Sequence, residues 1–188
     1  MMAKRLYKNR WVDLYETDRG FVFAQRHSIN STAALLYVKQ SNNDYKFLLR
    51  YQPLPELKIK EVPNLKWTNL YPCCVTGSLE KSETPIENVI KEVFEETNYI
   101  IKKTDIKAFN IVVSTTQMNE SVYNFIIDIS KAKLAKKVLG DGSLFENISQ
   151  NHWVTLKQLE NILCNNKEIY LSSLASAYLL FENKILKK

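Results

Sequence analysis

Residues 84–97 carry the strongest helix signal in the chain, and the neighbouring segments must be arranged around that helix. Thr84 and Glu87 form a T-x-x-E capping box, and Pro85 occupies the first helical position, where its missing N–H costs nothing. Asn98 follows the helix, and asparagine tolerates the left-handed backbone that ends many helices. One face of the predicted helix repeats with the helical period of 3.6 residues and consists of Ile86, Val89, Ile90, Val93 and Thr97. We therefore expect an amphipathic helix packed on a larger apolar surface.

Strand candidates lie on both sides of this helix. A turn signal at residues 17–20 predicts an N-terminal hairpin, and the proline-containing stretch 52–70 predicts a long loop. Further strands are expected at residues 31–38, 45–51, 71–76, 109–115 and 121–129, and helices after Thr155 and at about 172–187. This order is typical of the α/β class, with a mixed β-sheet in an α/β/α sandwich. We expect an N-terminal β-hairpin extension at residues 1–30 and a main domain at residues 31–188.

The charge of the chain limits the class of partner. The sequence has 26 Lys and Arg against 20 Asp and Glu, a formal net charge of +6. A basic surface favours polyanions, so we expect a small-molecule nucleotide as partner, with nucleic acid as a less favoured alternative. No apolar run reaches the roughly 18 residues of a membrane span, and no apolar segment follows the N-terminal charges, so we expect neither a span nor a signal peptide. Three cysteines without metal-binding spacing are typical of a reduced, cytoplasmic protein.

Three glutamates share one flank of the predicted helix. At about 100° per residue, Glu92, Glu95 and Glu96 fall beside the apolar face. Like charges three or four residues apart each cost roughly 0.2–0.5 kcal/mol, and Lys91 can offset part of this. Carboxylates crowded against a packed surface favour a hard cation, Mg²⁺, Mn²⁺ or Ca²⁺, over zinc. On the helix alone, an acidic face exposed to solvent is the favoured interpretation.

The stretch from Gly77 to Tyr99 resembles the Nudix box, G-x5-E-x7-R-E-U-x-E-E-x-G-U, in which U is a bulky aliphatic residue. One glycine and four glutamates match without a gap: Gly77, Glu83, Glu92, Glu95 and Glu96. Three positions depart from the pattern, namely Lys91 for arginine, Asn98 for glycine and Tyr99 for an aliphatic residue. Lysine keeps the charge but loses the planar fork that holds a carboxylate with two hydrogen bonds. The segment that begins at Trp153 also resembles a late W-V-x-x-x-x-L segment of the family.

The resemblance implies a fold, an activity and a set of site residues. It implies that the chain is a Nudix hydrolase that uses Mg²⁺, with Mn²⁺ as a substitute, to cleave a diphosphate linkage. The metal ligands would be the glutamates of the helix together with the backbone carbonyl before the box glycine: Glu92, Glu95, Glu96 and Thr76. Glu83 and Lys91 would orient these ligands. Gly77 and Asn98 would keep the backbone shape of the box.

The general base is left with two candidates. The resemblance places it in a late loop in enzymes that act on ADP-ribose, and Glu146 occupies such a loop. Glu120 is the other candidate, because its surroundings resemble the loop before the penultimate strand in those enzymes. For each residue, an exposed loop carboxylate without a catalytic role is the alternative interpretation.

The substrate is suggested by a second, shorter resemblance. The segment LLRYQP at residues 48–53 resembles V-R-Q-Y-R-P of ADP-ribose and nucleoside-diphosphate-sugar pyrophosphatases, which release a nucleoside monophosphate and a sugar phosphate. Arg50 could then contact a phosphate and Tyr51 could stack on a base, or both could be structural residues of a strand. A nucleoside triphosphate pyrophosphohydrolase, oxidised nucleotides included, and a non-catalytic nucleotide- or RNA-binding module are the alternatives. The N-terminal hairpin could pair across a homodimer, as in some relatives.

Overall fold

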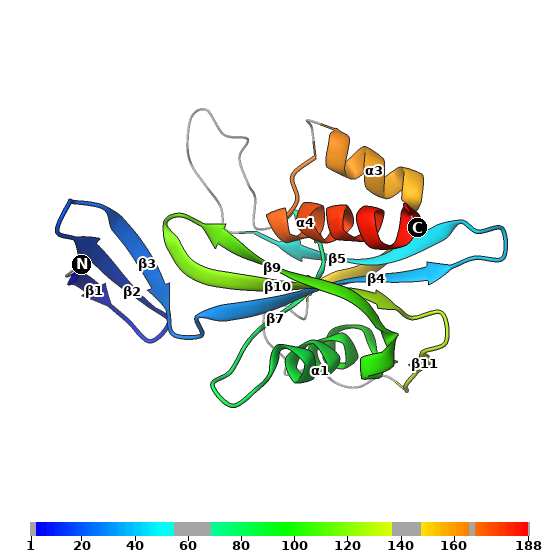
Figure 1. The fold of residues 1–188 in the computed structure, drawn as a ribbon, viewed down its shortest axis with the longest axis horizontal. Helices are drawn as coiled ribbons and strands as arrows, with labels where there is room; N and C mark the ends of the chain where they lie inside the picture. The colour runs from blue at the N-terminus through cyan, green and yellow to red at the C-terminus, as the bar shows by residue number, and fades with distance from the viewer. Residues whose placement is uncertain (1–2, 55–68, 137–147, 166–167, 188) are drawn as a thin grey trace.

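A computed structural model of the chain describes residues 3–54, 69–136, 148–165 and 168–187. A mixed β-sheet forms the central layer, with helix α1 (Pro85–Thr97) on one face and helices α3 (Leu156–Cys164) and α4 (Ser172–Phe181) on the other (Figure 1). The predicted α/β class, its mixed sheet and its three layers are therefore confirmed. No helix in the described ranges is long and apolar enough to cross a membrane.

The middle of the sheet is built on two long apolar strands. Strand β4 (Asn30–Lys39) pairs in parallel with β10 (Met118–Asp128) and antiparallel with β5 (Tyr45–Pro53). Residues 33–37 of β4 are buried on both faces, as its continuous apolar run predicts. Strand β9 (Ile106–Thr115) pairs antiparallel with β10, which confirms the predicted pair, and β12 (Gln150–Thr155) pairs with β5.

The strand predicted at residues 71–76 is two strands. Strand β6 (Leu70–Cys73) pairs with β5, and after Cys74 the chain pairs with β4 as β7 (Val75–Ser78). The chain changes partner at this point because β4 and β5 are neighbours, and residues 50–53 of β5 and 31–34 of β4 are both available for backbone pairing. The register of β7 sets Gly77 opposite Thr32. The predicted long loop at residues 52–70 falls mostly outside the described residues.

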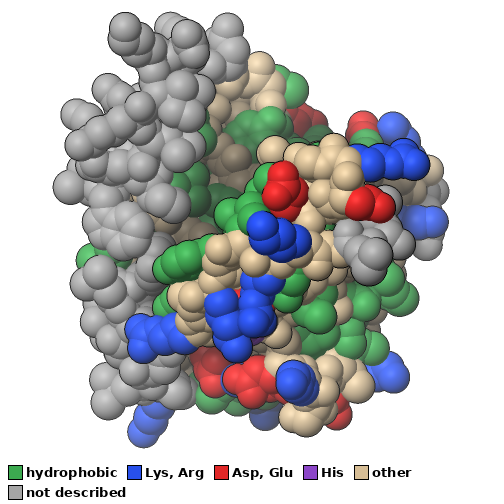
Figure 2. Space-filling model, turned by 90° about the vertical axis from the view of Figure 1, so that its left-hand side faces the viewer, with side chains coloured by type: hydrophobic (Ala, Val, Ile, Leu, Met, Phe, Trp, Pro, Cys, Tyr) green, Lys and Arg blue, Asp and Glu red, His purple; other side chains and the backbone are tan. Residues whose placement is uncertain are grey.

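The N-terminal region has one more strand than predicted. Strands β1 (Ala3–Lys8), β2 (Val12–Thr17) and β3 (Val22–Arg26) form an antiparallel meander, and β3 meets β10 at a single pair, Ala24 with Met118. The predicted turn is present, with Gly20 at a φ of 77°. Lysine and arginine side chains gather near the middle of the face at this end of the molecule, beside a few acidic ones (Figure 2). The predicted division at residue 30 stays a prediction.

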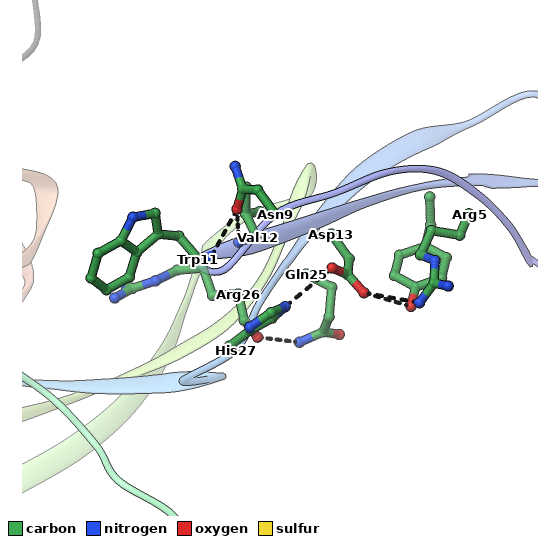
Figure 3. A network of polar contacts seen from close by, with 9 residues as sticks. Arg5, Asn9, Trp11, Val12, Asp13, Gln25, Arg26 and His27 are labelled. Carbon is green, nitrogen blue, oxygen red and sulfur yellow. Dashed lines mark hydrogen bonds and ion pairs between the residues drawn. The ribbon is translucent and has the colours of Figure 1, made fainter.

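The side chains of Asn9 and Asp13 stabilise the meander. The side chain of Asn9 accepts hydrogen bonds from the backbone N–H groups of Trp11 and Val12, which forms the turn between β1 and β2. Asp13 is buried and lies 3.1 Å from His27 Nε2 and 3.5 Å from Arg5 (Figure 3). The hydrogen bond from His27 is the main cause that lowers the pKa of Asp13. These contacts fix the position of the end of β3, which leads directly into β4.

The C-terminal helix is fastened to the sheet by aromatic side chains. Phe181 lies edge-on to Tyr37, Tyr45 and Phe47, with ring centroids 5.2, 5.1 and 4.9 Å away. Each such pair contributes roughly 0.5–1.5 kcal/mol beyond the burial of apolar area. The helix was predicted to run to Lys187, but α4 ends at Phe181 and a π-helical turn, η2 (Glu182–Leu186), follows. The remaining short elements are β8 (Tyr99–Ile100), η1 (Lys103–Asp105) and β11 (Lys133–Leu134).

Candidate active site

Helix α1 begins and ends where the sequence predicts. Thr84 Oγ1 accepts from the Glu87 N–H at 3.3 Å, and a Glu87 carboxylate oxygen accepts from the Thr84 N–H at 2.9 Å, which completes the capping box. Asn98 adopts the left-handed conformation, with a φ of 62°. Val89 and Val93 are buried against the sheet, and each contributes roughly 1.5–3 kcal/mol. The caps and the apolar face together fix which flank of the helix turns toward β7.

The glycine of β7 touches the first glutamate of the cluster. A Cβ atom placed on Gly77 would lie 2.2 Å from both Cγ and Cδ of Glu92, and 2.4 Å from its Oε1. A side chain at position 77 would fit only if the carboxyl group of Glu92 moved, because real contacts of Cβ atoms are almost never shorter than 3 Å. The requirement for glycine is one of close approach, since its φ is not in the left-handed region. The carboxyl group of Glu92 is thereby held against the backbone of β7.

The environment of Glu92 is unfavourable for its negative charge. Burial is the main cause, and the nearby carboxylates of Glu95 and Glu83 add to it; together they raise the pKa of Glu92 to about 7. Lys91 acts in the opposite direction without cancelling the shift. A carboxylate with a strongly raised pKa in a cluster of acidic groups is a common mark of a functional site. A bound dication would relieve this repulsion.

Asn88 connects the helix to two strands and to the preceding loop. This buried side chain accepts from Thr32 Oγ1 at 2.6 Å and donates to the Ser78 carbonyl at 3.1 Å and to Glu83 Oε2 at 2.9 Å. The hydrogen bond from Asn88 is the main cause that lowers the pKa of Glu83. Asn88 was not among the residues predicted for the site. Its signal was its position one helical turn before Glu92, where an uncharged polar residue interrupts the acidic flank.

The two residues predicted to orient the ligands contact each other. Lys91 Nζ lies 3.3 Å from Glu83 Oε1. Glu83 is thus held by Lys91 on one oxygen and by Asn88 on the other, which fixes the loop between β7 and α1. Lys91 was expected to offset the charge of Glu95. The charge of Glu95 does help to raise the pKa of Lys91, but the direct ion pair of Lys91 is with Glu83.

The last glutamate of the cluster lies against an arginine. Arg50 Nε is 3.1 Å from Glu96 Oε1, and both side chains are largely buried. The N–H of Arg50 is poorly directed at that oxygen, so the contact is an ion pair without a well-formed hydrogen bond. The Thr76 N–H lies 3.4 Å from Glu96 Oε2, and Asn151 Nδ2 donates to the Glu96 carbonyl at 2.6 Å. Arg50, predicted to meet a phosphate, therefore contacts the site through Glu96.

The other candidates from the sequence lie in different places. Tyr51 packs edge-on to His152 on the α3 and α4 side of the sheet, with ring centroids 5.0 Å apart, and burial raises its pKa. Glu120 is buried and forms an ion pair with Arg26. Glu146 lies outside the described residues. The structure thus gathers Thr76, Gly77, Glu83 and the helix glutamates, and separates Tyr51 from them.

The chemistry of the gathered groups suits a hard cation. Their donors are carboxylate and backbone oxygens, which favour Mg²⁺ or Mn²⁺. Burial, with a smaller contribution from the neighbouring carboxylates, raises the pKa of Glu92, and a bound cation would stabilise the charged form of this side chain. Within the described residues, no three His, Cys, Asp or Glu side chains form a group that could hold a metal ion as they stand. The contact of Glu96 with Arg50 draws one of the predicted ligands aside.

Comparisons with known proteins bear on the fold. No protein-family model matches the chain, and no curated protein matches it. Among solved structures, it is similar to the crystal structure of an ADP compounds hydrolase, with a TM-score of 0.62 and 12% sequence identity. The similarity covers 97% of this chain and 91% of that chain. The two proteins share a fold. At 12% identity the similarity shows the fold alone, so any chemical function must be argued from the residues of the site.

Proposed function

We propose that this protein is a divalent-metal-dependent hydrolase of the Nudix type that cleaves the diphosphate linkage of a nucleoside diphosphate joined to a second group. The observation that carries the proposal is the packing of Glu92 against Gly77, beside Glu95 and Glu83, with a pKa raised to about 7. The sequence pattern of the Nudix box and the fold shared with a hydrolase of ADP compounds support it independently.

The proposed metal ligands are Glu92, Glu95, Glu96 and the Thr76 carbonyl. When bound, Mg²⁺ would neutralise diphosphate charge and lower the pKa of a water molecule that attacks phosphorus. Glu96 would have to share or exchange its contact with Arg50. Glu83, Lys91 and Asn88 hold the flank of α1 in place, and Gly77 leaves room for the Glu92 carboxyl group. Glu120 and Glu146 remain the candidates for the general base.

The favoured substrate is ADP-ribose or a nucleoside-diphosphate sugar, which would yield a nucleoside monophosphate and a sugar phosphate. The test is a panel of ADP-ribose, nucleoside-diphosphate sugars and nucleoside triphosphates with Mg²⁺ or Mn²⁺, followed by phosphate detection. Sugar diphosphates release phosphate only after a phosphatase is added, whereas triphosphates release inorganic diphosphate directly. Turnover of the diphosphate-linked compounds supports the proposal. Direct diphosphate release from triphosphates alone would assign the chain to the alternative class.

One observation favours a second candidate function. The ion pair between Arg50 and Glu96 occupies a predicted ligand, as a non-catalytic module that binds nucleotide or RNA would allow. Such a module would show no turnover with any metal and would bind RNA with an affinity that falls steeply with salt, because phosphate contacts release counterions. The same panel, extended by RNA binding at two salt concentrations, separates the two candidates. In either case we propose a cytoplasmic protein, since Cys73, Cys74 and Cys164 are free thiols.

A further inference from the structure

Strand β9 forms an open edge of the central sheet. It pairs antiparallel with β10 along one side, and no other strand in the described ranges pairs with its second side. Its side chains alternate between half-buried and exposed over all ten positions. The half-buried set includes Ala108, which packs against the core on the side of α4. One row of backbone N–H and C=O groups of β9 therefore faces away from the sheet, where another strand can pair with it.

The exposed positions of β9 carry a stripe of apolar side chains. Phe109, Ile111 and Val113 are 59%, 54% and 70% exposed. They stand at every second position, so they point to the same face of the sheet. The ring of Phe109 stacks on that of Phe125, with centroids 5.9 Å apart, which places the stripe on the face that also carries α1. Helix α1 packs over β4 and β7 and leaves the stripe uncovered.

The sequence of β9 lacks the features that keep most edge strands from pairing, namely charges, proline and bulges. The strand contains no proline, and its pairing with β10 is regular from Ala108 to Val113. Its only charged residue is Lys107, whose Nζ is turned back and donates to the Thr104 carbonyl at 2.9 Å. The edge strand β1 is different, because three of its six residues are cations: Lys4, Arg5 and Lys8. The contrast points to β9, and not to the N-terminal hairpin, as the edge that accepts a partner.

The stripe is complementary to a second copy of itself. Two β9 strands related by a two-fold axis at Ile111 would pair antiparallel, with Phe109 of each copy opposite Val113 of the other. Aromatic and β-branched side chains that lie opposite each other stabilise paired strands. In this register Lys107 lies opposite Thr115, so no like charges meet. Moving the axis by one residue sets either Lys107 opposite Val113 or Phe109 opposite Thr115, so Ile111 is the favoured centre.

The area of this surface is that of a small, reversible dimer. Pairing of two ten-residue edges with their apolar stripes removes roughly 500 Å² from each partner, below the roughly 800 Å² of a standard stable interface. Each copy also carries a net charge of +6, which opposes association, whereas the stripe itself is uncharged. Salt screens the repulsion between the copies and leaves the apolar contacts in place, so a higher salt concentration should strengthen the dimer.

We propose that β9 is an interaction surface for a second copy of this chain, and that two copies join their sheets by antiparallel pairing of their β9 strands about Ile111. The pair uses the β9 edge of both copies, so it is closed and leaves neither β9 edge open to a third copy. The interface does not depend on the proposed hydrolase activity, because α1 and β7 take no part in it.

Sedimentation velocity over a range of protein concentrations tests the pairing. The wild type should pass from monomer to dimer as its concentration rises, and more readily at high salt. Ile111→Lys sets two like charges against each other at the axis and should weaken the dimer by about tenfold or more. Because Ile111 is half exposed, this variant should stay folded, which thermal unfolding checks. Ile29→Lys makes the same change at another half-exposed isoleucine, outside β9, and should dimerise like the wild type.

Cysteine cross-linking tests the register. In a Cys164→Ser background, which removes the exposed native thiol, Ile111→Cys should form an intermolecular disulfide, because opposite Cα atoms of paired strands lie about 4.5–5.5 Å apart. Lys107→Cys should not, since eight residues of strand would separate the two thiols by about 26 Å. A wild type that is monomeric at every concentration, or a dimer that Ile111→Lys leaves unchanged, would overturn the proposal. Equal cross-linking of the two cysteine variants would also overturn it, because it indicates parallel stacking.

Discussion

The carboxyl group of Glu92 occupies the space that any side chain at position 77 would need. This relationship joins a residue of β7 to a residue of α1 across 15 positions of sequence, and it is set by contacts of 2.2 to 2.4 Å to an added Cβ. It explains in steric terms why a glycine precedes the glutamate helix. It also makes the position of Glu92 sensitive to the smallest substitution at residue 77.

Gly77→Ala should displace Glu92 and destabilise the protein. Overpacking of this kind typically costs about 1–3 kcal/mol, and loss of the Glu92 position should reduce turnover by about 100-fold or more. Urea denaturation and steady-state kinetics measure the two effects. The double variant Gly77→Ala with Glu92→Ala removes the clashing atoms, so it should regain most of the lost stability and none of the activity. Equal instability of the single and double variants would show that the clash is not the cause.

The raised pKa of Glu92 predicts a pH-dependent stability of the metal-free protein. Because the folded state holds this proton up to about pH 7 while the unfolded state loses it near pH 4.5, stability falls as the pH rises through that window. Partial exposure screens the effect to about 1–2 kcal/mol. Urea denaturation at several pH values should show this loss in the wild type relative to Glu92→Gln. Parallel pH curves for the two proteins would refute the shift.

Asn88 should be intolerant of a change in charge at constant shape. Asn88→Asp replaces the donor to Ser78 and Glu83 by an acceptor, so two buried contacts become repulsive. We expect a loss of about 2–4 kcal/mol in the free energy of unfolding at pH 7. Asn161→Asp, an exposed site on α3, is the matched control and should change stability by less than about 0.5 kcal/mol. Similar losses at both positions would argue against the polar network.

Lys91 should be replaceable by arginine and by little else. Lys91→Arg keeps the ion pair with Glu83 and adds a second donor, so turnover should be preserved or raised. Lys91→Met leaves Glu83 without its cation and should lower turnover by about 10- to 100-fold. Lys133→Met, on the exposed strand β11, serves as control. A large loss in Lys91→Arg would show that the lysine has a role other than holding Glu83.

Local chemistry made much of the fold predictable. The caps of α1 and α3, the left-handed Asn98 and the pairing of β9 with β10 all follow from residues close together in the sequence. The buried strand β4 follows from its apolar run. The predicted site glutamates on α1 likewise share one flank because helical geometry alone decides that.

Contacts between distant segments were not predictable in this way. The pair of Arg50 with Glu96 joins residues 46 positions apart, and the pair of Arg26 with Glu120 joins residues 94 positions apart. The first depends on the packing of α1 against the sheet beside β7, and the second depends on the placement of β10 beside β3. Neither arrangement leaves a local pattern in the sequence. The division of residues 70–78 into two strands has the same origin. Tertiary pairing therefore determined which of the predicted residues meet.

The most direct test of the account is the rate at which AMP forms from ADP-ribose in the presence of Mg²⁺, measured for the wild type and for Glu95→Gln at matched folded fraction. Glu95 lies off the apolar face of α1, so the substitution should leave the fold intact. The account predicts that the wild type forms AMP in a metal-dependent manner and that Glu95→Gln is slower by about 100-fold or more. Equal rates for the two proteins, or no AMP from the wild type with either Mg²⁺ or Mn²⁺, would contradict it.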